Sequence, residues 1–422
     1  MATSEAVRMN INNRWFQLCA SVIAMIMIAN LQYAWALFVE PLRAGTGWKL
    51  SEIQLAATLF ILFQTWAQPC QGWLIDRMGP RLFISLAGVL CGIGWGGLGY
   101  ATSLPMLYTL YVVAGIGAAL VYGGSIGSAL KWFKTRRGLA SGIMAAGFGG
   151  GAGLFIPFIA SMLRTDGYRA TFLWTGVFQG LVILIVAQFL RHPPAEPASP
   201  AVARTANAAT RLGEHQFTTG EMLRTPQFYL MYLAFVMMAT GGLLLTLNAG
   251  SIAKSWGIAV AALAMAQSLN AIANGASRVF WGWVSDRTGR EAALVVGFLL
   301  HAACLLLVTT VGRVSGTWFA VTLVLTFFTW GEIYSLFPAL LGDYFGTRHA
   351  TSNYGVLYSA KGVASILGGW VAALIYESSG TWSAVLYASV ALALLAAALI
   401  VGLRALVSAS SRAAIAVPAT VK

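Results

Sequence analysis

Two positively charged residues lie where a membrane protein tolerates charge least. Of the 26 lysines and arginines, only Arg278 and Lys361 lie inside the long apolar stretches of the chain, away from the margins. Lys361 is 11 to 15 residues from either end of its stretch. At 1.5 Å rise per residue this is ~16–22 Å, which is farther than a lysine side chain reaches. Burying a charge in this way is costly, so an intramembrane cation predicts a functional site.

Two other roles are open for these cations. Arg278 is about five residues from one end of its stretch, so its side chain can still reach the membrane surface. Either cation can instead neutralise a buried acid. Glu332 is the only acid deep within an apolar stretch, so at most one cation can be paired in that way.

Helical spacing places polar and aromatic side chains beside both cations. Gln267, Asn270, Asn274 and Arg278 follow at i, i+3, i+7 and i+11, and Tyr354, Tyr358 and Lys361 at i, i+4 and i+7. Each set shares one helix face. Other stretches supply Gln32, Tyr33, Gln54, Gln64, Gln68, Tyr122, Trp330 and Tyr334. Taken singly, each aromatic is about as often a packing or interfacial residue as a ligand contact, and a glutamine can serve only to bridge helices. Together they predict a box for a small anion.

The elements that must hold these residues are membrane-spanning helices. The composition is 58% hydrophobic and 9% charged, whereas soluble proteins carry about 25% charged residues. The apolar blocks reach the ~20 residues that a bilayer crossing needs. Twelve spans are predicted, at 15–39, 52–75, 82–102, 105–130, 138–163, 169–190, 227–253, 259–283, 291–312, 316–342, 350–376 and 381–406.

The net charge of +13 follows this topology. With both termini on one side of the membrane, eighteen basic residues lie on that side and six on the other. The positive-inside rule then places both termini in the cytoplasm. The basic excess implies no nucleic-acid partner. We expect a multi-pass protein of the plasma membrane, typical of a bacterial inner membrane.

The chain also repeats itself. "GWLIDRMGPR" (72–81) follows the second predicted span and "GWVSDRTGR" (282–290) follows the eighth, at an offset of 210 residues. The polar segment 191–216 is rich in proline and alanine and predicts a flexible linker. These features divide the chain into a six-helix bundle at 1–190, a cytoplasmic linker at 191–226 and a second bundle at 227–422. "TTGEMLRTPQF" predicts a short surface helix before the seventh span.

The repeated loop resembles the signature of the major facilitator superfamily, which lies between spans two and three and again between spans eight and nine. That resemblance implies two pseudo-symmetric six-helix bundles around a central cavity, with substrate bound near the midplane. The charged loop residues are expected to hold the cytoplasmic ends together and to release them during rocking: Asp76, Arg77, Arg81, Asp286, Arg287 and Arg290. The alternative is that they are ordinary charged anchors.

A narrower resemblance covers nearly the whole chain. "NLQYAWALF", "RRGLASG", "GEMLRTPQF", "SRVFWGWVSDRTGR", "FFTWGEIYSLFP" and "SNYGVLYSAKGVASILGG" are similar to the oxalate–formate antiporter family. The resemblance implies that Arg278 and Lys361 bind the two carboxylates of oxalate. It places the surrounding cage on Gln32, Tyr33, Tyr122, Trp330 and Tyr334, with Tyr358 beside Lys361. The family's best-known oxalate carrier has glycine at the position of Glu332 and tryptophan at that of Tyr358, so pyruvate-like carboxylates remain open.

Two mechanisms stay possible. A dianion that neutralises both cations predicts exchange of oxalate, or a similar dicarboxylate, for formate. A Glu332 that accepts a proton predicts symport of a monocarboxylate such as pyruvate or lactate. Helical phase favours exchange, because Glu332 lies about 200° from Trp330 around an ideal helix.

Other classes of protein fit the sequence less well. A sensor would need a larger soluble domain, and the four scattered histidines and four cysteines form no nucleophile–base pair or metal cluster. We therefore expect no enzyme activity, no metal and no cofactor. The expected partners are small carboxylate anions and the lipid bilayer, and the expected functional unit is a monomer.

Overall fold

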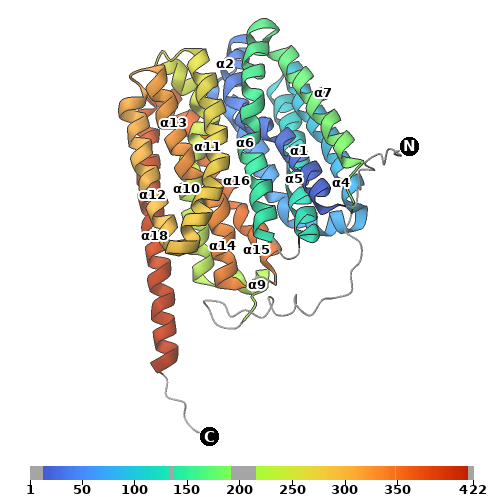
Figure 1. Cartoon of the computed structure of the whole chain (residues 1–422). Coiled ribbons are helices and arrows are strands. Elements are labelled where there is room, and N and C mark those ends of the chain that lie inside the picture. Colours follow the sequence, from blue (N-terminus) through green and yellow to red (C-terminus); the bar gives the residue numbers. More distant parts are fainter. Residues whose placement is uncertain (1–12, 134–136, 192–214, 347, 417–422) are drawn as a thin grey trace, which may run out of the picture.

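The computed structural model describes residues 13–133, 137–191, 215–346 and 348–416. All regular structure in these ranges is helical, and the helices form two groups that stand side by side (Figure 1). The first group, here the N-terminal half, contains α1 (Arg14–Tyr33), α2 (Trp35–Thr46), α3 (Leu50–Trp66), α4 (Gln68–Gly97), η1 (Leu98–Tyr100), α5 (Leu104–Trp132), α6 (Arg137–Thr165) and α7 (Gly167–Ala187).

The second group, here the C-terminal half, follows the segment 192–214. It contains α9 (Thr219–Met222), α10 (Pro226–Ser255), α11 (Val260–Thr288), α12 (Arg290–Leu307), η2 (Val308–Gly312), α13 (Gly316–Trp330), α14 (Ile333–Phe345), α15 (Ala350–Tyr358), α16 (Ala360–Ser365), η3 (Ile366–Val371), α17 (Ala372–Ser379) and α18 (Ser383–Ala416). In Figure 1, α18 extends well beyond the other helices of its half. We call the end of the molecule at which α9 lies the linker end (Figure 1).

The internal repeat is visible in the backbone. Gly79 of the first loop motif and Gly289 of the second both have positive φ angles, 74° and 89°. Glycine reaches this region without steric cost, so each motif turns the chain sharply between two helices. Two further pairs of positive-φ glycines fall at matching turns of the two halves: Gly47 with Gly257, and Gly167 with Gly380. Three matched turns support a common ancestral plan for the halves.

Ten helices in the described part are long and apolar enough to cross a membrane. The regions predicted at 52–75 and 259–283 are not among them. α3 has 17 residues, and α11 carries the polar stripe that ends in Arg278. The structure therefore supports a helical membrane-spanning protein, and the number twelve stays a prediction.

Three of the long helical runs are interrupted next to candidate site residues. Tyr33 is the last residue of α1, Trp330 the last of α13, and Tyr358 the last of α15. Interrupted helices free backbone groups and redirect side chains, and membrane carriers commonly place them at substrate sites. The predicted spans 15–39, 316–342 and 350–376 are thus not single regular helices.

The short surface helix predicted before the seventh span is confirmed as α9. Its cap is a reciprocal pair, because Glu221 N–H donates to Thr218 Oγ1 and Thr218 N–H donates to Glu221 Oε2 at 2.8 Å. The backbone and hydroxyl of Thr218, together with His215, lower the pKa of Glu221 to about 2. This cap fixes the chain direction just before α10 begins.

Candidate functional site

Lys361 lies between the two halves and is 1% exposed. Its Nζ donates to Gln32 Oε1 at 2.8 Å, to Gln64 Oε1 at 3.1 Å and to the Tyr358 hydroxyl at 3.4 Å. Gln32 is on α1 and Gln64 is on α3, so a cation of the C-terminal half is held by amides of the N-terminal half. The Lys361 side chain does not reach toward the membrane surface.

Arg278 is 3% exposed and is also held across the two halves. Its Nη1 donates to the backbone carbonyl of Ala145 on α6 at 2.8 Å, and its Nη2 donates to Asn274 Oδ1 at 3.0 Å. Within the described ranges, neither Arg278 nor Lys361 forms an ion pair with an acid. Both positive charges are therefore balanced only by neutral acceptors.

The Tyr334 ring lies close to both cations. The Arg278 Cζ is 4.7 Å from the centroid of the Tyr334 ring, and the Lys361 Nζ is 5.8 Å from the same centroid. These distances set an upper limit of 10.5 Å between the two charged atoms. One small anion can contact both cations at that separation.

The predicted aromatic residues gather around this pair. Tyr358 stacks on Tyr122 at 5.6 Å and meets Tyr334 edge-on at 6.2 Å, and Tyr334 meets Trp330 edge-on at 5.3 Å. Tyr33 joins them through Phe148, at 5.6 Å. The structure thus brings every predicted cage residue into one cluster. We call it the cage: Gln32, Tyr33, Tyr122, Arg278, Trp330, Tyr334, Tyr358 and Lys361.

The free hydrogen-bonding groups of the cage are mainly donors. A lysine or arginine can only donate, so Gln32 and Gln64 turn their oxygens to Lys361, and Asn274 turns its oxygen to Arg278. Their amide nitrogens are left buried and without a partner in the described part of the chain. The same holds for Arg278 Nε, Trp330 Nε1 and the hydroxyl of Tyr334. A surplus of buried donors around two cations suits a ligand that is rich in acceptor oxygens.

Glu332 lies on a different surface of its helical run. It is fully buried, and its carboxyl group packs so closely on Gly297 of α12 that a Cβ at Gly297 would overlap it. Neither carboxyl oxygen has a hydrogen-bond partner among the described residues. Glu332 therefore neutralises neither cation in this conformation. A buried carboxyl without partners is stable only as the neutral acid.

The charged loop residues whose side chains are described make their contacts within their own half. Arg290 pairs with Asp286 at 2.6 Å and approaches Asp343 to 3.8 Å, so this network lies within the C-terminal half. Arg287 lies over the Trp283 ring at 3.9 Å. In the N-terminal half, Arg81 Nε donates to Gln188 Oε1 at 2.7 Å. The side chains of Asp76 and Arg77 lie outside what the structure describes.

The opposite end of the molecule carries two acids that join the halves. Glu40 of α2 accepts hydrogen bonds from Lys254 Nζ at 2.6 Å and from Ser251 Oγ at 2.8 Å. Glu377 of α17 accepts from the N–H and hydroxyl of Ser51, at 2.9 and 2.7 Å. Burial raises the pKa of Glu40, but Lys254, Ser251 and Arg43 outweigh it and lower the pKa below its ordinary value. We call these contacts the Glu40–Glu377 latch.

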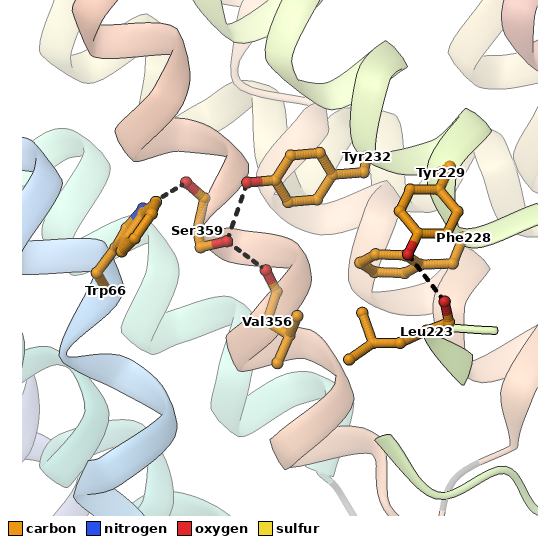
Figure 2. A pocket seen from close by; sticks show the side chains of 7 residues that line it. All are labelled: Trp66, Leu223, Phe228, Tyr229, Tyr232, Val356 and Ser359. Atoms are coloured by element: carbon orange, nitrogen blue, oxygen red, sulfur yellow. Dashed lines mark hydrogen bonds between the residues drawn. The ribbon is translucent and has the colours of Figure 1, made fainter. Parts of the chain in front are cut away.

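A pocket of about 420 Å³ opens beside the cage toward the linker end. Figure 2 shows the rings of Trp66 and Tyr232 on either side of Ser359. Trp66 Nε1 donates to the Ser359 carbonyl at 3.3 Å, and the Tyr232 and Ser359 hydroxyls are 3.1 Å apart. Its remaining lining is mostly apolar: Leu223, Phe228, Tyr229 and Val356. Ser359 of this pocket directly follows Tyr358 of the cage along the chain.

Two cage contacts were missed or undervalued by sequence reasoning. Phe148 of α6 packs against Tyr33 and Tyr122, and its ring centroid is 5.5 Å from Lys361 Nζ. A phenylalanine in an apolar, glycine-rich helix carries no sequence signal for a binding site. Gln64 was weighed mainly as a bridge between helices, yet it contacts Lys361 directly. Gln54 is a true bridge, from Trp35 to the Leu247 carbonyl.

Comparison with known proteins agrees with this architecture. The family model described as Major Facilitator Superfamily matches residues 20–249 and 230–420. A bacterial homologue of the human lysosomal transporter Spinster, solved in an inward-facing and unoccupied conformation, is similar in fold. It has a TM-score of 0.65 and 16% sequence identity, and the match covers 94% of this chain and 97% of that one.

Two groups of relatives bear on the family within this fold. Monocarboxylate transporter 11 of Homo sapiens is 28% identical over 55% of this chain and 47% of its own length. The oxalate:formate antiporter of Oxalobacter formigenes is 39% identical over 88% of this chain and 87% of its own length. These relatives are transporters and not enzymes. The chain belongs to the Major Facilitator Superfamily and, within it, to the family of the oxalate:formate antiporter.

Proposed function

We propose that this protein exchanges small carboxylate anions across the membrane by alternating access, taking oxalate or a similar dicarboxylate in one direction and formate in the other. The observation that carries this proposal is the pair Arg278 and Lys361. Both are buried, neither is paired with a described acid, and unused hydrogen-bond donors surround them. The relationship to an oxalate:formate antiporter supports the same substrate class.

The chemistry of binding follows from charge. Each carboxylate of a dianion would replace the neutral acceptors of one cation, since hydrogen bonds between ionised groups are about twice as strong as neutral ones. The Tyr and amide donors of the cage would take the remaining oxygens. Without a dianion the two cations repel each other, which opposes the dehydration that closure of the carrier demands. Binding therefore favours closure, and a carrier that closes only when loaded is an exchanger.

The proposal includes a domain arrangement and an orientation. The halves 1–190 and 227–422 rock about the cage, joined by the linker 191–226, with both termini and the linker end in the cytoplasm. Asp76, Arg77 and Arg81, together with Asp286, Arg287 and Arg290, are proposed to secure the cytoplasmic ends of the halves. The working unit is a monomer in the lipid bilayer of the plasma membrane.

Uptake into liposomes tests this proposal. Purified protein in vesicles preloaded with formate is expected to take up labelled oxalate rapidly, and empty vesicles are expected to take up little. Exchange of a dianion for a monoanion moves one net charge, worth about 2.3 kcal/mol per 100 mV, so an imposed potential should change the rate. Rapid net uptake into empty vesicles would contradict obligatory exchange.

Proton-coupled uptake of a monocarboxylate is the second candidate, with Glu332 as the proton site. The unpartnered, fully buried carboxyl group favours it, because such a group holds a proton in this conformation. That group packs against Gly297 and forms no ion pair with Arg278 or Lys361, which argues against direct coupling to substrate. Symport predicts alkalinisation of the outer medium during uptake of pyruvate or lactate, lost in Glu332→Gln. Exchange predicts that Glu332→Gln keeps counterflow.

A further inference from the structure

Phe148 stands out among the rings beside Lys361. Among the described residues, three ring centroids lie within 6 Å of Lys361 Nζ: Phe148 at 5.5 Å, Tyr334 at 5.8 Å and Tyr358 at 5.5 Å. The two tyrosines come from the C-terminal half and carry hydroxyls that can bind a carboxylate. Phe148 comes from the N-terminal half and has no polar group, so it can shape the cage but cannot hydrogen-bond an anion.

The turn of α6 that carries Phe148 touches both cations. The Ala145 carbonyl accepts from Arg278 Nη1 at 2.8 Å. A Cβ at Gly149 would lie 3.1 Å from the Arg278 Cζ, so the Gly149 backbone lies directly against the guanidinium group. One residue earlier, the Phe148 ring faces Lys361. This turn therefore forms the wall of the cage that runs from one cation to the other.

The α6 backbone cannot move away from the cage, because two of its glycines pack closely against α1 and α11. A Cβ at Gly151 would lie 2.9 Å from the Ile26 Cα of α1, and one at Gly153 would lie 3.0 Å from the Ser268 carbonyl of α11. Tyr122 and Tyr33 hold the Phe148 ring from the sides, at 5.3 and 5.6 Å between centroids. The ring is thus fixed by contacts on its backbone and on both flanks.

We propose that Phe148 is a specificity-determining residue that sets the width of the cage and excludes dicarboxylates with an sp³ carbon between their two carboxylates. A dicarboxylate that spans Arg278 and Lys361 must lie along the wall that this ring forms. An sp³ carbon between the carboxylates, as in malonate, projects hydrogens toward the ring. In a closely packed apolar contact, one methylene changes discrimination by about 10- to 200-fold. This inference rests on the proposed function and adds the basis of its selectivity.

The test measures, within each protein preparation, the preference for oxalate over longer dicarboxylates. Wild type, Phe148→Leu, Phe148→Ala and Phe235→Ala are reconstituted in liposomes, and inhibition of labelled oxalate exchange by unlabelled oxalate, malonate and succinate is compared. Because each ratio comes from one preparation, a loss of folded protein does not alter it. Phe235 is the matched control: it is buried and packs behind Tyr334 and Tyr358, at 6.1 and 6.4 Å, without contacting either cation.

The expected result is that Phe148→Ala lowers the preference for oxalate over malonate by about tenfold or more, with a smaller change in Phe148→Leu. Phe235→Ala should keep the wild-type ratio. Unchanged ratios in both Phe148 variants would overturn the inference, as would an equal shift in Phe235→Ala. Wild-type protein that exchanges no dicarboxylate would instead refute the proposed function, so the two failures are distinguishable.

Discussion

At the scale of single residues, the site is defined by two positive charges that no acid in the described part of the chain neutralises. Lys361 and Arg278 are held by amide, hydroxyl and carbonyl oxygens, all of them neutral. Neutral acceptors fix the position of a cation but do not neutralise its charge. An anionic ligand can neutralise it. The same contacts orient the amides of Gln32, Gln64 and Asn274 so that their free atoms are donors. Both effects point toward an anion with several oxygens.

Gln32→Glu tests this reading directly, because it places a carboxylate 2.8 Å from Lys361 in a side chain of nearly equal size. The new acid would cancel one cation permanently. Oxalate exchange is expected to fall by tenfold or more, about the cost of one charged hydrogen bond of 1.5–3 kcal/mol, while thermal stability holds or rises. Gln32→Leu, which adds no charge, is the control and should lower stability. Wild-type exchange in Gln32→Glu would count against charge cancellation by substrate.

The two cations and most of the aromatic cage could be predicted from sequence, because a charge or tyrosine stands out in an apolar helix and helical spacing shows which side chains share a face. Phe148 could not be, since an apolar residue in an apolar helix looks the same whether it faces substrate, protein or lipid. Whether Glu332 faced the cations could be argued only from ideal helical phase. The break between α13 and α14, at Gly331 and Glu332, makes that phase unreliable.

At the scale of elements, the interrupted helices and the glycines of α6 position the cage. The breaks after Tyr33 and Tyr358 contain no proline or glycine, so their sequence gives little warning of them. The eighth predicted span, which is α11, shows the opposite case: its sequence reveals the site but hides the membrane span. The polar stripe that made α11 a candidate for the site also makes it too polar to be recognised as a membrane span by hydropathy.

Adjacent glycines of α6 offer a matched test of element packing. A Cβ at Gly149 would lie 2.7 Å from Asn274 Oδ1 and 3.1 Å from Arg278 Nε, whereas a Cβ at Gly150 would meet its nearest atom, the Ala271 carbonyl, at 3.6 Å. Gly149→Ala must therefore shift the Asn274 amide, which accepts a hydrogen bond from Arg278, and it crowds the Arg278 guanidinium group itself. Gly150→Ala meets only ordinary van der Waals contacts. We expect Gly149→Ala to weaken apparent oxalate affinity several-fold and Gly150→Ala to keep it, as measured by exchange kinetics. Equal effects of the two substitutions would show that Arg278 placement does not depend on this contact.

At the scale of the whole molecule, the two halves are joined around the cage and at the Glu40–Glu377 latch. In the latch, Glu40 of the N-terminal half accepts hydrogen bonds from the C-terminal half, and Glu377 of the C-terminal half accepts hydrogen bonds from the N-terminal half. Each half therefore supplies one acid that holds this end closed. An alternating-access carrier must break these contacts to open here. We therefore expect Glu40→Gln, and more strongly the double substitution with Glu377→Gln, to populate a state open at this end.

Spin labels on cysteines introduced at the exposed positions Ala44 and Ser255 would report this opening as a longer distance in pulsed EPR. Cys19, Cys70, Cys91 and Cys304 are replaced first so that only the introduced sites react. The control is Glu52→Gln, which removes an acid that caps α3 without joining the halves. Identical distance distributions in wild type and the double variant would exclude the latch as a determinant of closure.

The same latch has a defined pH dependence. Because the pKa of Glu40 is lowered in the closed form, its ionised contacts favour closure above its ordinary pKa, near 4.3 in unfolded chains, and this contribution disappears as pH falls through the lowered value. The Ala44–Ser255 distance should therefore stay constant from pH 8 to pH 5 and lengthen only in stronger acid. In Glu40→Gln this acid-dependent change should be reduced. A transition near neutral pH would assign control of closure to another group.

The central claim is that two buried cations exist to be cancelled by one small dicarboxylate, and equilibrium binding tests it most directly. Labelled oxalate is bound to purified wild type, Lys361→Gln and Arg278→Gln, each first shown by size-exclusion chromatography to be folded. The account predicts saturable binding to wild type and a loss of affinity of about tenfold or more in each single variant, since each removes one charged contact of 1.5–3 kcal/mol. Wild-type affinity in either folded variant would contradict it.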